Sequence, residues 1–414
     1  MKIKNLLLIS TVIFSLIKVS YAQSDSTGCF TMQRAELFAQ TDTSFARKYA
    51  ELFRVHAVSL RSVNQVITIP VVVHIVYNNS LENISQLQVQ SAIDVLNEDY
   101  RMLNPNLVNT NPAYINLAAD CEINFCLVGT TRTYTSYQDF PVNSSLWTNG
   151  DVDYVKDLAP GYGQGYLNIW VCDIQGSMYG YAVFPGMAPQ QYDGITVDYQ
   201  YFGRTGIANT VYAGRTVTHE VGHWLGLLHI WGSLTGTYGS YCDDDYVADT
   251  YPQHRPNPNM CNYDYTSCPN YGPGYIGPYS GMNENFMDYS QGACMTFFTL
   301  GQKQRITAMI LTYRYYLIAS PIPCNTYLAE NLKQETEFNY DHNTHQLNFV
   351  TTMENSGAQL KIYNLSGKEV FADDRYTNQR AGTFTYYLPY LCAGTYIIDF
   401  YCADQYLRRK LIIL

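Results

Sequence analysis

The stretch HEVGHWLGLLH, which begins at His219, carries residue types that can bind and use a metal ion. Residues four apart lie on one helix face, so His219 and His223 can hold one Zn²⁺ through their imidazole nitrogens. Glu220 lies beside them and can act as general base on a metal-bound water. Gly226 permits a sharp exit from the helix, which can bring His229 back as a third ligand. Three protein ligands leave a position for water, as in catalytic zinc sites, whereas the alternative is a helix with core histidines.

A second motif follows at residues 285–289, which read NFMDY. It fits the methionine turn that accompanies the extended zinc motif in metzincins. Met287 is expected to lie beneath the histidines as an apolar floor, although a lone methionine can also be an ordinary core residue. Tyr289 is placed to bring its hydroxyl to the oxyanion that develops during hydrolysis of an amide.

The composition indicates a folded chain of two or three domains, with 414 residues of which 47% are hydrophobic. Only 14% are charged and 39 are tyrosine, a composition common outside the cytoplasm. The net charge is −10 and no basic stripe is visible, so nucleic acid is not an expected partner. An exported chain with eleven cysteines should have most of them paired, with at least one left over.

Residues 1–22 read as a signal peptide. Lys2 and Lys4 form a positive start, an apolar run covers 6–17, and small residues up to Ala22 suit cleavage before Gln23. The alternative is an N-terminal anchor helix. No later stretch approaches 18 apolar residues, so we expect no stable membrane span.

The elements that must position the motifs can be read from periodicity. We expect one or two helices in 32–55, a buried strand in 66–76, and a helix capped by Ser85 that stops near Pro105. Further strands are expected near 122–128, 166–174 and 194–199, and helices in 214–230 and 300–317. This order predicts an α+β domain with a sheet. From residue 327 onward, short alternating strands between Gly and Asn turns predict a small β-sandwich.

The chain resembles the pappalysin family of metzincins over roughly residues 66–324. The matching segments, beyond the zinc helix, are 69–74 (IPVVVH), 94–99 (DVLNED), 167–170 (LNIW), 180–185 (GYAVFP), 193–199 (DGITVDY) and 297–299 (FFT). The resemblance implies a secreted zinc metalloendopeptidase that cleaves protein or peptide substrates. It also implies a metzincin-type fold, with an upper α/β lobe containing a mixed sheet and a lower irregular lobe. In this fold the strand near 180–184 is an edge that pairs with an extended substrate.

The same resemblance suggests how the irregular stretch 232–285 is held. It implies the disulfides Cys242–Cys268 and Cys261–Cys294, which spacing alone would leave among three pairings. It also implies a calcium loop at 245–250, with Asp245, Val247, Asp249 and Thr250 as oxygen ligands. The alternative for this loop is a solvated acidic turn. Spacing leaves the partners of six cysteines open: Cys121, Cys126, Cys172, Cys324, Cys392 and Cys402.

Two positions bear on latency and specificity. Pappalysin-like precursors often carry a cysteine just before the catalytic domain, which implies that Cys29 binds the zinc and displaces the catalytic water. The alternatives are a cysteine without a role or an intermolecular disulfide, and some relatives use an aspartate instead. In some bacterial members an aspartate after the methionine turn selects Arg and Lys. Gly292 aligns with it, which predicts weak selectivity for basic residues unless Asp243, Asp244 or Asp288 substitutes.

The C-terminal part is similar to type IX secretion sorting domains. The matching segments are 362–368 (IYNLSGK), 391–396 (LCAGTY) and the end, 408–414 (RRKLIIL). The resemblance implies contact with a secretion machinery, whereas the alternative is a structural or carbohydrate-binding sandwich.

These observations give a domain plan: signal peptide 1–22, pro-segment 23–65, catalytic domain 66–324 and sorting domain 327–414. The expected function is a secreted or cell-surface zinc endopeptidase that uses Zn²⁺ for catalysis and Ca²⁺ for structure. A cell-surface binding protein on a degenerate protease fold is the alternative, disfavoured because Glu220 and the histidines are intact. A zinc hydrolase of small molecules has no support in the sequence.

Overall fold

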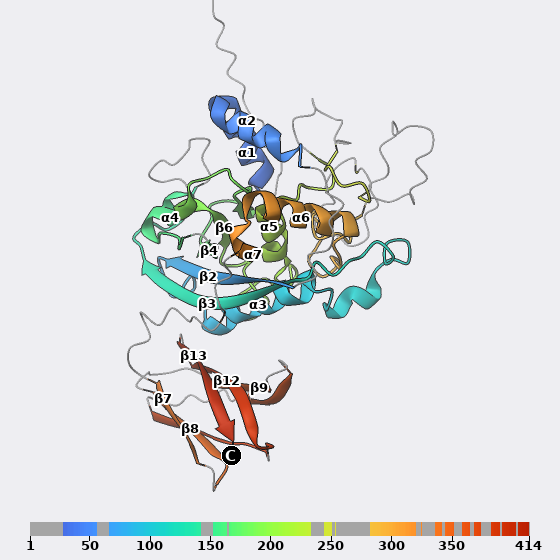
Figure 1. Ribbon diagram of the computed structural model, residues 1–414. Coiled ribbons are helices and arrows are strands. Elements are labelled where there is room, and N and C mark those ends of the chain that lie inside the picture. Colours follow the sequence, from blue (N-terminus) through green and yellow to red (C-terminus); the bar gives the residue numbers. More distant parts are fainter. Residues whose placement is uncertain are drawn as a thin grey trace, which may run out of the picture.

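The computed structural model describes residues 28–55, 66–141, 152–163, 165–232, 244–250, 253, 282–319, 324, 336–341, 344–351, 358–364, 368–373, 382–389, 391–402 and 405–413. The expected signal peptide lies outside them. The described residues form an α+β unit around one sheet and a second unit of strands β7 to β13 (Figure 1).

A six-stranded mixed sheet is the centre of the α+β unit. Its strand order is β1 (Gly28–Cys29), β5 (Met178–Ala182), β6 (Gly194–Asp198), β4 (Leu167–Cys172), β2 (Ile67–Tyr77) and β3 (Ile123–Tyr134). Strands β6, β4, β2 and β3 run parallel, and β5 is antiparallel to β6. The β-branched run predicted as a buried strand is β2, whose interior positions are buried on both faces.

The edge expected near 180–184 is covered in this structure. Strand β1, from the expected pro-segment, pairs in parallel with β5, and Cys29 lies opposite Gly180. In this form of the chain, the protein's own N-terminal part pairs with that strand.

Helices cover the sheet. They are α1 (Thr31–Thr41), α2 (Thr43–Leu52), α3 (Gln86–Tyr100), α4 (Tyr154–Leu158), α5 (Arg215–Trp224), α6 (Leu300–Tyr313) and α7 (Tyr316–Ala319), with short 3₁₀ turns at Pro105–Asn109 and Gln190–Tyr192. The predicted cap of α3 is confirmed, because the Ser85 side chain accepts from the Gln88 amide at 3.2 Å.

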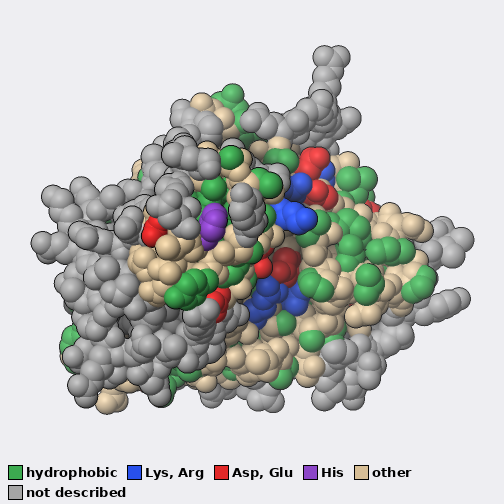
Figure 2. All heavy atoms as spheres, turned by 90° about the horizontal axis from the view of Figure 1, so that it is seen from below, with side chains coloured by type: hydrophobic (Ala, Val, Ile, Leu, Met, Phe, Trp, Pro, Cys, Tyr) green, Lys and Arg blue, Asp and Glu red, His purple; other side chains and the backbone are tan. Residues whose placement is uncertain are grey.

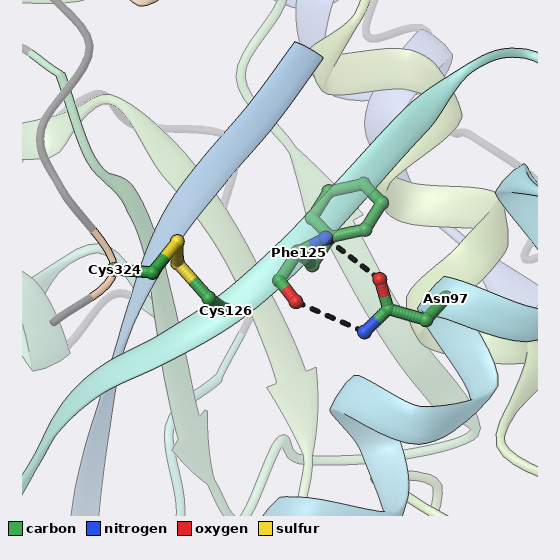
Figure 3. The surroundings of a disulfide bond; sticks show 4 residues. All are labelled: Asn97, Phe125, Cys126 and Cys324. Atoms are coloured by element: carbon green, nitrogen blue, oxygen red, sulfur yellow. Dashed lines mark hydrogen bonds between the residues drawn. A yellow bond between two sulfur atoms is a disulfide. The ribbon is translucent and has the colours of Figure 1, made fainter. Parts of the chain in front are cut away.

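Strand β3 is fixed on both sides (Figure 3). The Asn97 side chain on α3 accepts from the Phe125 amide at 2.8 Å and donates to the Phe125 carbonyl at 2.9 Å. The next residue, Cys126, forms a disulfide with Cys324, 198 residues away. This bond ties the end of the α+β unit to its sheet.

Two helices are shorter than the periodicity predicts. The metal-motif helix, expected over 214–230, ends at Trp224 because Gly226 has φ +91. The helix expected over 300–317 breaks at Arg314, which leaves helical geometry. There the Arg314 guanidinium turns inward to the Asp193 carboxylate and donates to the Trp224 carbonyl at 3.1 Å.

The C-terminal strands form two antiparallel sheets, as the alternation predicts. The four-stranded sheet has the order β10 (Glu369–Asp373), β9 (Ala358–Asn364), β12 (Gly394–Cys402) and β13 (Gln405–Ile413), and the three-stranded sheet has the order β11 (Gly382–Tyr387), β8 (Gln346–Thr351) and β7 (Thr336–Asp341). Leu347 and Tyr386 of one sheet share a buried core with Ile362 and Phe400 of the other. The two sheets therefore pack as a small sandwich.

Several of the described cysteines are not in disulfides. Among the described cysteines, Cys29, Cys121, Cys172 and Cys392 are free thiols, and all but Cys392 are buried. On the face shown in Figure 2, basic and acidic side chains lie beside one another near the centre. None of the helices in the described part of the chain is long and apolar enough to cross a membrane.

Candidate active site

The three histidines of the motif meet at one buried point. Their Nε2 atoms are 3.1–3.2 Å apart in all three pairs, and none of the side chains is more than 5% exposed. Helix α5 carries His219 and His223 one turn apart. His229 reaches the same point because the chain turns at Gly226, where an added Cβ would lie 2.5 Å from Met309 Cγ. The turn that the sequence predicts is thus built into the packing.

Backbone carbonyls fix the orientation of two of these rings. His219 Nδ1 lies 2.8 Å from the Phe286 carbonyl, and His223 Nδ1 lies 2.8 Å from the Leu227 carbonyl. A carbonyl only accepts, so each Nδ1 carries the proton and each Nε2 presents a lone pair. Burial lowers the pKa of His219 to about 4, which keeps its ring neutral.

A zinc ion fits this arrangement. Two unprotonated nitrogens 3.1 Å apart cannot hydrogen-bond to each other, so their contact calls for a cation between them. Tetrahedral zinc with nitrogen ligands at about 2.0–2.1 Å requires separations of about 3.3 Å, close to those observed. The neutral, carbonyl-oriented imidazoles are also the form in which histidine binds metals.

Helix α5 is anchored from below by α3. Asp99 pairs with Arg215 at 3.2 Å and accepts from the Thr218 hydroxyl at 2.7 Å. The neighbouring Tyr100 hydroxyl donates to the Thr218 carbonyl at 3.1 Å. All of these groups are buried, so they hold the turn of α5 that begins the metal motif.

Met287 of the predicted methionine turn packs against the metal helix α5. Met287 is fully buried, and a Cβ added to Gly222 on α5 would lie 2.5 Å from its sulfur, so a glycine is needed there. The Tyr289 ring packs against His219 and His229, with centroid distances of 5.7 and 4.9 Å. Its hydroxyl donates to the Cys29 carbonyl at 2.7 Å.

The N-terminal segment covers the rest of the site. Cys29 Sγ belongs to one cluster with the three histidines, in which the ligand atoms lie within 4.8 Å of one another. This thiol also approaches Glu220 Oε2 at 3.4 Å. The Thr31 hydroxyl donates to the same oxygen at 2.9 Å and accepts from the Ala182 amide of β5 at 2.7 Å. The segment therefore contacts the edge strand and the carboxylate together.

Glu220 is fully buried, and its other oxygen, Oε1, has no hydrogen-bond partner among the described residues. Burial raises the pKa of Glu220 to about 8, an effect that the contacts with Cys29 and Thr31 reduce.

The comparisons with known proteins agree with this geometry. Residues 162–311 match the model of the peptidase M43 family, described as pregnancy-associated plasma protein-A. A protein of Arthroderma otae named extracellular metalloprotease is 31% identical over 255 residues, which cover 60% of this chain and 79% of that protein. The chain belongs to the pappalysin family of metalloproteases. The family expected from the sequence is confirmed.

Other relatives of this pappalysin match a similar share of its chain. Extracellular metalloprotease 1 of Coccidioides posadasii is 31% identical over 251 residues, 58% of this chain and 76% of that protein. Mature mirolysin of Tannerella forsythia, solved with a cleaved peptide, is 39% identical with a TM-score of 0.52 and covers 63% of this chain and 100% of its own. A promirolysin variant from that organism is 36% identical with a TM-score of 0.58, and covers 72% and 100%. The metzincin-type α+β fold is thereby confirmed.

A pocket adjoins the histidines of the pappalysin. Gly292 lines it, together with Tyr212, Arg215 and His219. A Cβ at Gly292 would overlap the Tyr212 carbonyl, so this backbone has no room for a side chain. Asp288 also lines the pocket, but its two oxygens accept hydrogen bonds from Gln253 at 2.9 Å and Ser290 at 2.8 Å.

The expected calcium loop is described only in part. Asp245 and Thr250 are buried, and the Thr250 hydroxyl lies 2.7–2.8 Å from both Asp245 oxygens and from the Val247 carbonyl. Asp249 faces α6 instead, where it accepts from the Thr299 hydroxyl and the Gly301 amide. Asp245 and Thr250 thus meet, and Asp249 has a capping role that the sequence analysis missed.

Not all predicted residues fall within the described chain. Cys242, Cys261 and Cys268 lie outside it, as does Asp243, so the two implied disulfides are not described. Cys294 is disulfide-bonded. Two features of the site were not predicted from the sequence: the contact of Thr31 with Glu220, and the buried ion pair of Arg34 with Asp153. Thr31 lies two residues after Cys29, so its place near the site could have been inferred. Nothing in the sequence marks Asp153 as the partner of Arg34.

Proposed function

We propose that this pappalysin is a secreted zinc endopeptidase that the structure describes in a latent form. The observation that carries the proposal is the convergence of three buried imidazole nitrogens next to a buried glutamate. The relatives named extracellular metalloproteases support both the activity and the location.

The residues divide the work of peptide hydrolysis. His219, His223 and His229 would hold zinc, which when bound supplies a Lewis acid that polarises the scissile carbonyl and acidifies water. Glu220 takes the proton from the attacking water and passes it to the leaving amine. The Tyr289 hydroxyl donates to the oxyanion; in the structure it donates to the Cys29 carbonyl, which occupies an acceptor position for it.

Latency follows from the same contacts. The proposed pro-segment, residues 23–65, brings the Cys29 thiol to the position where a fourth zinc ligand would bind, and a thiolate is a strong ligand. Thr31 and Cys29 also occupy one oxygen of Glu220. Activation would therefore require removal of this segment, which frees the metal, the base and the edge strand together.

Selectivity next to the cleaved bond is proposed to be broad. Gly292 supplies no carboxylate, and the nearby Asp288 oxygens already accept hydrogen bonds. Arg215 also lines the pocket, but its charge is paired with that of Asp99. A basic side chain there would lack its partner, so we expect cleavage beside uncharged residues.

Two further proposals concern the rest of the chain. Ca²⁺ suits Asp245, Val247 and Thr250, because one hydroxyl proton cannot serve three oxygens at 2.7–2.8 Å, and a cation would relieve their repulsion. Asp249 was predicted as a fourth ligand, but its carboxylate accepts hydrogen bonds from residues at the start of α6 instead. The unit after residue 327 is proposed as the sorting domain that contacts a secretion machinery.

Incubation of the purified chain with casein, with and without a zinc chelator, tests the proposed activity. We expect fragments without chelator, none with it, and recovery on adding zinc. Casein that stays intact after the pro-segment has been removed would contradict the proposal and favour a binding protein on a protease-like fold.

A further inference from the structure

The pro-segment carries a positive charge into the enzyme. Arg34, on the first turn of α1, forms an ion pair with Asp153, which directly precedes α4. The two side chains are only 5% and 1% exposed. Burying such a pair is costly unless the surroundings are built for it, so the groups around Asp153 are informative.

These groups belong to the enzyme rather than to the pro-segment. Asp153 Oδ1 accepts from the Tyr181 hydroxyl and lies 3.2 Å from Lys156 Nζ. Asp153 Oδ2 receives the Arg34 guanidinium, which also lies over the Tyr181 ring, 5.2 Å from its centroid. A carboxylate oxygen beside an aromatic face is a suitable site for a guanidinium. Departure of the pro-segment leaves both of these groups in place.

The site lies close to the position of the cleaved bond. Tyr181 follows Gly180 on β5, and an added Cβ on Gly180 would lie 3.1 Å from Glu220 Cγ. Neighbouring residues of a strand are about 3.3 Å apart and point to opposite faces of the sheet. Tyr181 and its partner Asp153 therefore lie one residue along β5 from Gly180, on the face opposite to Glu220, where a peptide paired with β5 would direct every other side chain. A peptide paired with β5 would bring its second or third residue from the cleaved bond there.

A cavity marks the same place as a binding site. It is lined by Arg34 and Phe38 of the pro-segment and by Tyr181, Phe184 and Met187 of the enzyme. The pro-segment thus fills one side of a hollow whose other side is the edge strand and the segment after it. Its removal opens this hollow to whatever pairs with β5.

We propose that the pocket around Asp153 is a substrate subsite for a basic side chain, and that Arg34 fills it in the precursor. This rests on the proposed peptidase activity and concerns a different pocket from that at Gly292. Lys156 already balances much of the Asp153 charge, so the planar fork of arginine should be preferred to lysine.

Matched peptides on the processed enzyme test the subsite. Each set carries Arg, Lys or Gln at the second or the third position from the cleaved bond and is otherwise identical. We expect Arg to raise kcat/KM over Gln by about tenfold at one of these positions, the size of a charge-assisted hydrogen bond. Asp153→Asn should bring this ratio close to one. Asp157→Asn, at an exposed position on the helix that follows Asp153, should leave the ratio unchanged.

The outcomes separate the two proposals. Hydrolysis without preference for Arg in the unsubstituted enzyme, or a preference that survives Asp153→Asn, would overturn the subsite and leave the peptidase activity standing. If Asp153→Asn does not fold, citrulline in place of Arg decides the matter on the unsubstituted enzyme, because it keeps the shape without the charge. Equal rates for the two peptides would overturn the subsite. No hydrolysis of any peptide would remove the proposed function and the subsite with it.

Discussion

The two halves of the active site are held in different ways. His219 and His223 are oriented by carbonyls of the enzyme itself, those of Phe286 and Leu227, and their helix is anchored by Asp99. The catalytic carboxylate and the oxyanion tyrosine instead take partners from the pro-segment: Glu220 contacts Cys29 and Thr31, and the Tyr289 hydroxyl donates to the Cys29 carbonyl.

This difference suggests how a precursor can be complete and yet inactive. The metal-binding half is formed by the enzyme alone, and the pro-segment only adds Cys29 as an extra ligand. We therefore expect it to bind zinc before and after activation. The half that handles protons and the oxyanion is the one that is occupied. Activation then requires no refolding of the histidine cluster, only withdrawal of the contacts on Glu220 and Tyr289.

The largest effect should come from Glu220→Ala. Removal of the base should reduce peptide hydrolysis by the processed enzyme at least about a thousandfold, while zinc content stays at one ion per chain because the histidines are untouched. Activity assays and metal analysis on the same sample check both halves. Near-normal hydrolysis would contradict the role of Glu220.

Tyr289→Phe should have the next largest effect. Loss of one oxyanion donor should lower kcat on the order of a hundredfold, with KM for a peptide changed much less. The same change removes the hydrogen bond to the Cys29 carbonyl. An unchanged kcat would remove Tyr289 from the catalytic machinery.

A substitution beneath the histidines should affect the other half. Asp99→Ala leaves Arg215 buried without its carboxylate, which should cost about 3–5 kcal/mol of unfolding free energy. Because it loosens the start of α5, zinc affinity should also fall, by about 10–100-fold. The control is Glu98→Ala, on the same helix as Asp99, which breaks a partly exposed ion pair with Arg204. It should lower the unfolding free energy by at most about 1 kcal/mol. Equal effects of the two variants would count against the anchoring role.

Cys29→Ala should have the smallest effect of these substitutions. The processed enzyme lacks residue 29, so its activity should be unchanged. In the full chain, however, the substitution removes the proposed fourth ligand and one contact of Glu220. We expect measurable hydrolysis before processing, and faster processing on gels. A variant precursor as inert as the original would place latency in Thr31, Arg34 and the covered edge strand instead.

Local patterns predicted much of this molecule. Strand β2, the Ser85 cap of α3 and the metal helix rest on residues near in sequence, and the histidine spacing alone brought three ligands together. Long-range contacts were beyond this reasoning. Cys126 meets Cys324 across 198 residues, and the edge strand pairs with β1 from far upstream. The exit from α5 at Gly226 was predicted from the glycine, whereas apolar periodicity alone would have continued the helix to residue 230.

The coordination of zinc in the full chain and in the processed enzyme tests the central claim most directly. X-ray absorption at the zinc edge should show one sulfur at about 2.3 Å and three nitrogens at about 2.0 Å in the full chain. After processing the sulfur should be gone and the three nitrogens should remain. A precursor without the sulfur ligand, or a processed enzyme that has lost nitrogen ligands, would contradict the view that the pro-segment masks a preformed histidine site.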